Sequence, residues 1–297
     1  MKRWLILLAL LAASGAALFY SQRQKGETHV GPEGMLNALA DTEREWSRIP
    51  ASLTRLSDQQ EIRVGDAMAE NYLARRPVLS GDDLELEKYV SSVGQSVSAH
   101  ARRKLDYRFH YLPDAGLVNA FALPGGHVFI GKGLVQMMTS EDELASVLGH
   151  ETEHVDHYHC NDRVALQSRL RHMPLAQLVM LPVELFQAGY SKEQEMEADG
   201  DGTALAVAAG YSPQGALDLF QTFARLRQRR ETKPGSPGEE LSQVAIGSLA
   251  GYFRSHPFPE EREAQVRRLI AANKWPQPAE RPLRVRPEAA KSAHAGR

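Results

Sequence analysis

Apolar residues recur at helical spacing along most of the chain. In residues 58–74, Ile62, Ala69 and Leu73 fall on one side of a helix among charged neighbours, which indicates a half-buried helix. The same pattern predicts further helices at residues 81–103, 191–209, 212–230, 241–253 and 260–273. Ser191 and Gln194 have the spacing of a capping box, in which each residue satisfies a backbone N–H at the helix start.

Between the second and third of these helices the pattern becomes that of short strands. Residues 107–111 alternate aromatic with polar side chains, and residues 117–123 and 127–130 are two further strand candidates. Pro124, Gly125 and Gly126 separate the last two and are typical of a turn, so we expect a hairpin. The predicted fold class is therefore α+β, mostly helical with a small β-sheet.

Two other apolar stretches need separate interpretation. Lys2 and Arg3 precede an uncharged apolar run at residues 4–20, which predicts a signal peptide or an N-terminal membrane anchor at residues 1–20. The pattern does not distinguish cleavage from retention, and in either case we expect the rest of the chain to be exported. Residues 172–189 are apolar but contain Pro174 and Pro182, so they predict a buried helix or a lip over a site rather than a membrane span.

Residue composition divides the rest of the chain into a linker, a folded domain and a tail. Residues 21–50 are polar and glycine-containing, as in a linker, and residues 276–297 carry prolines and arginines typical of a disordered tail. The intervening residues 51–275 are the predicted folded domain. The 297 residues are 42% hydrophobic, enough for a substantial core, and the net charge of −2 gives no broad basic surface for nucleic acid. Cys160 is the only cysteine, so no intrachain disulfide can form, and we interpret it as a half-buried thiol.

The strongest chemical signal is an H-E-x-x-H array in a predicted helix that starts near residue 140. His150 and His154 are four residues apart, so a helix would direct both imidazoles to one point, as a zinc ion requires. Glu151 lies one step round the helix and could reach a water bound to that ion. Ser140 and Glu143 have capping-box spacing, which supports the helix.

A catalytic zinc ion usually has a third protein ligand, and the acidic residues near 195 are the candidates. Glu195 could bind the ion, and Asp199, one turn away, could hold a ligand histidine in one tautomer. Spacing alone does not decide between Glu195 and Glu197, because either acid could face the histidines.

Five motifs in a fixed order carry a family resemblance. They are Asn119 to His127 (NAFALPGGH), Gly133-Leu134, His150 to His154, Glu195 to Asp199 (EMEAD), and Ser255-His256-Pro257 with Arg262. In this order they resemble the metallopeptidase family that includes the CAAX prenyl endopeptidases, the HtpX-type heat-shock proteases and the periplasmic β-barrel-assembly-enhancing protease. The resemblance covers residues 57–270 and is greatest to the exported branch without multiple membrane spans. Thr152 and Glu153 are more polar than the usual family pair, and Tyr158 stands where an arginine is common.

The resemblance implies a zincin-like (gluzincin) core with one Zn2+ per chain, bound by His150, His154 and Glu195. It makes Glu151 the general base and Asp199 the partner of a ligand histidine. It also implies that His256 approaches the ion, either to occupy its open position in a latent enzyme or to stabilise the oxyanion. A substrate strand is expected to bind along Asn119, Ala120, Phe121, Ala122, Leu123, Pro124, Gly125 and Gly126.

The function that follows is a zinc metalloendopeptidase acting on misfolded or unassembled polypeptides. The expected location is the periplasm or cell envelope, with membrane association through the N-terminal helix if that helix is retained. The alternative is a non-catalytic, zinc-containing chaperone or assembly factor. An intact general base and an edge strand favour the enzyme.

Overall fold

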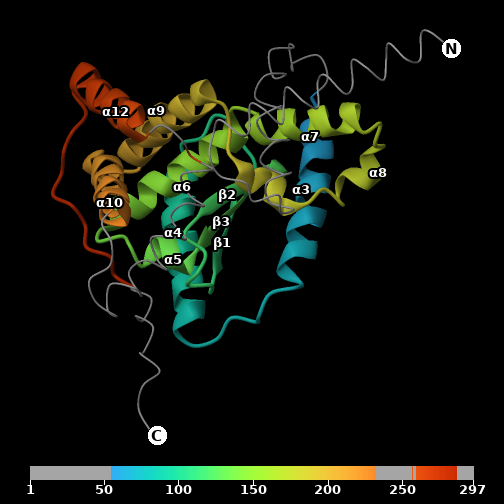
Figure 1. Ribbon diagram of the computed structural model, residues 1–297, viewed down its shortest axis with the longest axis horizontal. Helices are drawn as coiled ribbons and strands as arrows, with labels where there is room; N and C mark the ends of the chain where they lie inside the picture. The colour runs from blue at the N-terminus through green and yellow to red at the C-terminus, as the bar shows by residue number, and fades with distance from the viewer. Residues whose placement is uncertain (1–54, 232–255, 257–258, 286–297) are drawn as a thin grey trace, which may run out of the picture. The chain divides into compact units, whose positions relative to one another are not determined.

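Helix α6 (Glu141–Asp156) carries the H-E-x-x-H array and lies in the middle of the fold (Figure 1). In this computed structural model, residues 55–231, 256 and 259–285 are described, all within the compact unit Arg44–Arg297. The capping box predicted for α6 is present: Glu143 N donates to Ser140 Oγ at 3.2 Å, and Ser140 N donates to the Glu143 carboxylate at 2.9 Å. All residues of α6 except Ser146 are buried, so neighbouring elements cover it on every side.

A three-stranded sheet covers part of α6. Strands β2 (Ala120–Leu123) and β3 (His127–Gly131) form the predicted antiparallel hairpin through the 3-10 turn η2 (Pro124–Gly126). Gly125 and Gly126 have φ of 81° and 103°, values that residues with a side chain rarely adopt. Strand β1 (Arg108–Leu112) pairs in parallel with β3, which the sequence did not predict, and the order is β1-β3-β2. Strand β2 begins at Ala120, three residues later than predicted, and lies at one edge of this sheet.

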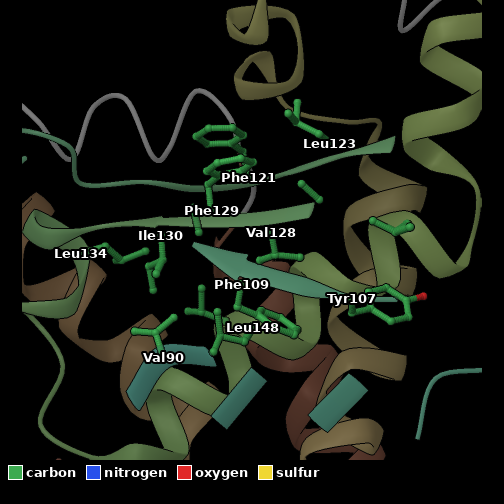
Figure 2. Packing of buried hydrophobic residues seen from close by; sticks show 14 of the residues in the cluster. Val90, Tyr107, Phe109, Phe121, Leu123, Val128, Phe129, Ile130, Leu134 and Leu148 are labelled. Atoms are coloured by element: carbon green, nitrogen blue, oxygen red, sulfur yellow. The ribbon is translucent and has the colours of Figure 1, made fainter. Parts of the chain in front are cut away.

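The two faces of the sheet pack on different helices. Phe109 on β1 lies near Val90 of α4 (Asp82–Ser98) and Leu148 of α6 (Figure 2). On the other face, Phe121 and Phe129 stack at 5.0 Å between ring centroids (Figure 2). Helix α3 (Asp58–Leu73) covers this second face, where the ring of Tyr72 meets both phenylalanines edge-on.

Helix α4 ends five residues before the predicted boundary at Arg103. The backbone N–H groups of Arg102 and Arg103 donate to the Asp156 carboxylate at the end of α6, at 3.0 and 2.6 Å. A helical continuation would direct these N–H groups back into α4 instead. The tertiary contact with α6 therefore ends the helix at Ser98.

Beyond α6 the chain reverses at Tyr158 into α7 (His159–Leu170), followed by the short helices α8 (Leu175–Leu178) and η3 (Val183–Ala188). The apolar stretch predicted as a buried helix or lip is only partly buried, and Met180 is 74% exposed. It is also divided, because Pro174 and Pro182 each begin a new short helix. η3 packs beside β2. Cys160 is fully buried near the start of α7, not half-buried as predicted, because Tyr190 covers its thiol at 3.2 Å.

The remaining helices enclose α6 from the side opposite the sheet. Helix α9 (Lys192–Ala208) has the predicted capping box and packs along α6, while α10 (Gln214–Glu231) also contacts α6 and α12 (Pro259–Asn273) packs on α9 and α10 (Figure 1). The predicted segments 1–20, 21–50 and 241–253 lie outside the described residues. Among the residues that the structure describes, no helix is long and apolar enough to cross a bilayer.

Residues 276–285 belong to the segment predicted as a disordered tail, but the structure shows this part of the segment in contact with the start of α6. Arg281 N donates to Asp142 at 2.6 Å, and Arg281 O accepts from Glu141 N at 2.7 Å. Leu283 is 7% exposed and joins the main core, and Pro282 forms a bridge with Ser140. Composition predicted disorder here because composition carries no information about tertiary partners. The N–H groups at the start of α6 have no partner inside that helix and are available to this segment.

The fold class is confirmed: the described chain is mostly helical with one small sheet, and the histidine array lies on a helix.

Candidate metal centre

Helices α6 and α9 bring three of the predicted ligands together. His150 and His154 lie one turn apart on α6, and their Nε2 atoms are 3.1 Å from each other. Glu195 on α9 faces them, with Oε2 at 3.5 Å from His150 Nε2 and Oε1 at 3.6 Å from His154 Nε2. The three side chains are 8%, 0% and 0% exposed, so this meeting point lies inside the protein.

The spacing of these atoms fits a tetrahedral metal ion. Zinc bonds to nitrogen or oxygen ligands are about 2.0–2.2 Å long, which separates tetrahedral ligands by roughly 3.3–3.6 Å. The separations of 3.5 and 3.6 Å lie within that range, and the separation of 3.1 Å between the two imidazoles lies just below it. Glu195 Oε1 is also buried without a hydrogen-bond partner among the described residues, a costly arrangement unless a cation binds it.

Asp199 and Arg262 support the centre from behind. Asp199 Oδ1 is 2.9 Å from His150 Nδ1, so a proton on Nδ1 leaves the Nε2 lone pair facing the other ligands. Arg262 donates through Nε and Nη2 to the same carboxylate at 2.6 and 2.7 Å, and its Nη1 is 3.2 Å from Glu195. The sequence marked Arg262 only as part of a motif, because the pairing depends on how α12 packs on α9.

His256 enters the same cluster. Its Nδ1 is 3.3 Å from His150 Nε2 and 3.0 Å from Glu195 Oε2, and its side chain is 3% exposed. The four residues His150, His154, Glu195 and His256 form one group whose ligand atoms all lie within 4.8 Å of one another. His256 therefore reaches the centre, as the resemblance implied.

Glu151 is buried beside the ligands. Its residue is 1% exposed, and its Oε1 is 3.5 Å from His256 Nε2. Burial raises the pKa of Glu151, an effect that the nearby histidines only partly offset. A carboxyl group in this setting accepts and releases a proton more readily near neutral pH than an exposed one.

The protein's own charges keep the ligand set ready for a cation. Burial would raise the pKa of Glu195, but His256 and Arg262 hold it well below its usual range, so this carboxylate stays ionised. Arg262 likewise outweighs burial and lowers the pKa of Asp199. Burial lowers the pKa of His154 well below its ordinary value, which keeps its imidazole neutral and able to bind a metal.

His150 follows the opposite trend. Burial alone would lower its pKa, but hydrogen bonds to Asp199 and Glu195 outweigh burial and raise it to about 9. The proton that this pKa describes occupies the place where a bound cation would stand, so metal binding has to displace it.

Two residues on the far side of His154 were missed by sequence reasoning. Tyr190 stacks on the His154 ring at 4.0 Å between centroids, and His159 Nδ1 is 2.9 Å from His154 Nδ1. His159 was visible as a histidine shortly after the array. Its contact depends on the left-handed turn at Tyr158, which residue spacing does not reveal.

The predicted substrate segment lies next to α6. Ala120 to Leu123 form the edge strand β2, which packs on α6, and Pro124 to Gly126 form the turn η2. Asn119 precedes the strand, and its carbonyl accepts a hydrogen bond from Gly131 N at 2.9 Å. All of these residues are buried.

Comparison with known proteins places these features in a family. Residues 84–270 match the sequence model of peptidase family M48. The chain is 27% identical over 235 residues to the beta-barrel assembly-enhancing protease of Escherichia coli strain K12, a match that covers 71% of this chain and 44% of that protein.

Two further relatives extend the comparison. The chain is 26% identical over 283 residues to metalloprotease LoiP of Escherichia coli strain K12, covering 89% of this chain and 97% of that protein. It is 29% identical over 207 residues to the mitochondrial metalloendopeptidase OMA1 of Schizosaccharomyces pombe, covering 61% and 54%. The chain thus spans less than half the length of the assembly-enhancing protease that it matches.

Proposed function

The chain belongs to peptidase family M48, and from this premise we propose that it is a zinc-dependent metalloendopeptidase. The observation that carries the proposal is the convergence of His150, His154 and Glu195 within 3.6 Å of one another, with Glu151 buried beside them. A purely structural zinc site needs no adjacent carboxylate base, whereas a catalytic site of the H-E-x-x-H type places one beside its ligands.

Different residues of the chain carry out different steps of peptide hydrolysis. His150, His154 and Glu195 would hold one zinc ion per chain, which would supply a water of lowered pKa and a positive charge for the scissile carbonyl. Glu151 takes the proton of the attacking water and returns it to the leaving amine, and its burial suits it to both transfers. Asp199 holds His150 in the tautomer that binds the ion.

His256 is proposed as a ligand of the resting enzyme. Its Nδ1 lies as close to His150 Nε2 and to Glu195 as those ligands lie to each other, which is the spacing of a fourth ligand. A histidine at the fourth position excludes the attacking water, so the enzyme is latent until His256 moves away. The alternative role of His256 is to donate to the oxyanion.

The proposed substrates are extended polypeptides, such as misfolded or unassembled proteins of the cell envelope. The edge strand β2 supports this, because a polypeptide can add to a sheet edge through main-chain hydrogen bonds that tolerate many sequences. Asn119 and residues 120–126 would provide this binding edge. The envelope location rests on the apolar segment 1–20 and on the relatives named for barrel assembly.

The decisive test replaces Glu151 with Gln. Gln has the same shape but cannot take the proton, so Glu151→Gln should keep one zinc ion per chain and lose casein hydrolysis by roughly 100-fold or more. The matched control is Glu193→Gln, an exposed acid on α9, which should behave as wild type. Normal hydrolysis by Glu151→Gln would eliminate the mechanism. A variant without hydrolysis that still rescued a deletion strain would favour the non-catalytic chaperone.

The role of His256 is tested in the same assay with His256→Ala. Removing a fourth ligand should raise casein hydrolysis severalfold in a protein that keeps its zinc. A lower rate with zinc retained would reject latency and leave His256 as an oxyanion donor only.

A further inference from the structure

A second group of metal-binding side chains joins the end of α6 to α9. His157 Nδ1 is 3.2 Å from one oxygen of Glu197, and His159 Nε2 is 3.3 Å from the other. The two imidazole rings are nearly parallel, with an interplanar angle of 15° and 5.5 Å between centroids. One ligand atom from each of the three residues lies within 4.8 Å of the others. Glu197, which could have been only a solvated acid, is therefore the centre of this group.

The turn between α6 and α7 is what brings the two histidines to the same side. Tyr158, between them, has φ of 65°, a left-handed conformation that is uncommon for a residue with a large side chain. The guanidinium groups of Arg103 and Arg55 lie over its ring at 3.9 and 4.6 Å, which holds the turn in place.

His157 is oriented as histidine ligands of metals are. Its Nε2 is 2.8 Å from Asp201 Oδ2 and 3.2 Å from Glu153 Oε2. A proton on Nε2 is donated to Asp201 and leaves the Nδ1 lone pair facing Glu197. A lone pair and a carboxylate only 3.2 Å apart need a proton or a metal cation between them.

This group is accessible from solvent, unlike the catalytic centre. His157, His159 and Glu197 line a cavity of about 620 Å3, and the Glu197 side chain is 48% exposed. An ion can therefore enter and leave without opening the core. Two imidazoles and one carboxylate are a ligand set that suits zinc and other transition metals better than calcium or magnesium.

We propose that His157, His159 and Glu197 form a second, weaker site for a divalent transition-metal ion. The two imidazole nitrogens lie 3.2 and 3.3 Å from the two oxygens of the Glu197 carboxylate, close enough for the three side chains to share one ion. The site is proposed from these residues alone and does not depend on the proposed function.

The site itself is tested by zinc stoichiometry, which does not depend on catalysis. In equilibrium dialysis against Zn2+, the wild type should bind one ion tightly and a second more weakly. His157→Asn should weaken the second ion at least 10-fold and leave the first unchanged, because His157 does not contact the catalytic ligands. The control is His100→Asn, an exposed histidine outside the group. A single ion in the wild type, or an undiminished second ion in His157→Asn, would overturn the proposal.

Discussion

At the scale of single residues, the centre depends on buried charges that neutralise one another. Glu195 and Arg262 are 0% and 2% exposed at their side chains, and neither would be stable there alone. The Arg262 guanidinium pairs with both Asp199 and Glu195, which leaves the histidines free to face the metal. The charges of these residues thus keep the ligand set ionised before any metal ion binds.

The lowered pKa of His110, a histidine outside the metal centre, predicts that the stability of the protein depends measurably on pH. Burial, reinforced by His127 and Arg108, lowers the pKa of His110 to about 4. The unfolded chain takes up a proton near pH 6.5 and the folded chain only near 4, so His110 reduces stability as the pH falls through this window. Between pH 7.5 and 5.0 the loss attributable to this residue is on the order of 2 kcal/mol.

The measurement is urea unfolding of the wild type and His110→Gln at both pH values. Gln can still hydrogen-bond His127, 3.0 Å away, but does not titrate. The variant should therefore lose less stability on acidification than the wild type, while His100→Gln, at an exposed position, should follow the wild type. The same acid loss in His110→Gln and wild type would contradict this assignment.

At the scale of elements, the spacing of the ligands depends on how closely α6 and α9 approach. A Cβ atom placed on Gly202 of α9 would lie 2.6 Å from His150 N, in the backbone of α6. A Cβ on Gly149 would likewise lie 2.5 Å from Gly202 O. The two glycines therefore let the backbones touch where His150 faces Glu195.

Gly202→Ala should push the two helices apart and separate Glu195 from the histidines. We expect zinc affinity to fall at least 10-fold, measured by competition with a chelator of known affinity. Gly200→Ala is the matched control, because its Cβ would meet only the side-chain ends of Leu269 at 3.1 Å and Gln265 at 3.4 Å. Both changes add about 1 kcal/mol of helix propensity, so their difference isolates the backbone contact. Equal zinc affinities would show that the contact does not set the ligand spacing.

At the scale of the whole molecule, residues 276–285 fasten the end of the described chain to the start of α6. The Arg281 carbonyl accepts from the Glu141 N–H, a group that a helix start leaves without a partner inside the helix. The Arg281 N–H donates to the Asp142 carboxylate. Leu283 adds an apolar contact with the core. This segment stabilises α6, and α6 carries two of the three predicted metal ligands, His150 and His154.

Deleting residues 277–297 should lower the free energy of unfolding by on the order of 3 kcal/mol, from the loss of one buried leucine and of hydrogen bonds at a buried helix start. Deleting only residues 286–297 should have little effect, because the contacts described above remain. Thermal unfolding of both truncated proteins measures the difference. Equal melting temperatures would show that the segment contributes no stability.

The sequence by itself determined the local structure and the type of chemistry. Capping boxes at Ser140 and Ser191, the glycine turn at Gly125 and the four-residue spacing of His150 and His154 each depend on neighbours in the chain, so they could be predicted. The ordered motifs indicated the family before the fold was known. These features are local, and local backbone geometry follows directly from residue type and spacing.

Only the tertiary structure decided which distant residues meet. Residue spacing did not decide whether Glu195 or Glu197 faces the H-E-x-x-H array. The packing of α9 on α6 directs Glu195 to the histidines of the array and Glu197 to His157 and His159. The parallel pairing of β1 with β3, the end of α4 and the return of residues 276–285 were equally beyond local pattern. Each depends on contacts between segments far apart in the chain, where close packing and the pairing of buried polar groups, rather than the periodicity of one segment, determine the lowest free energy.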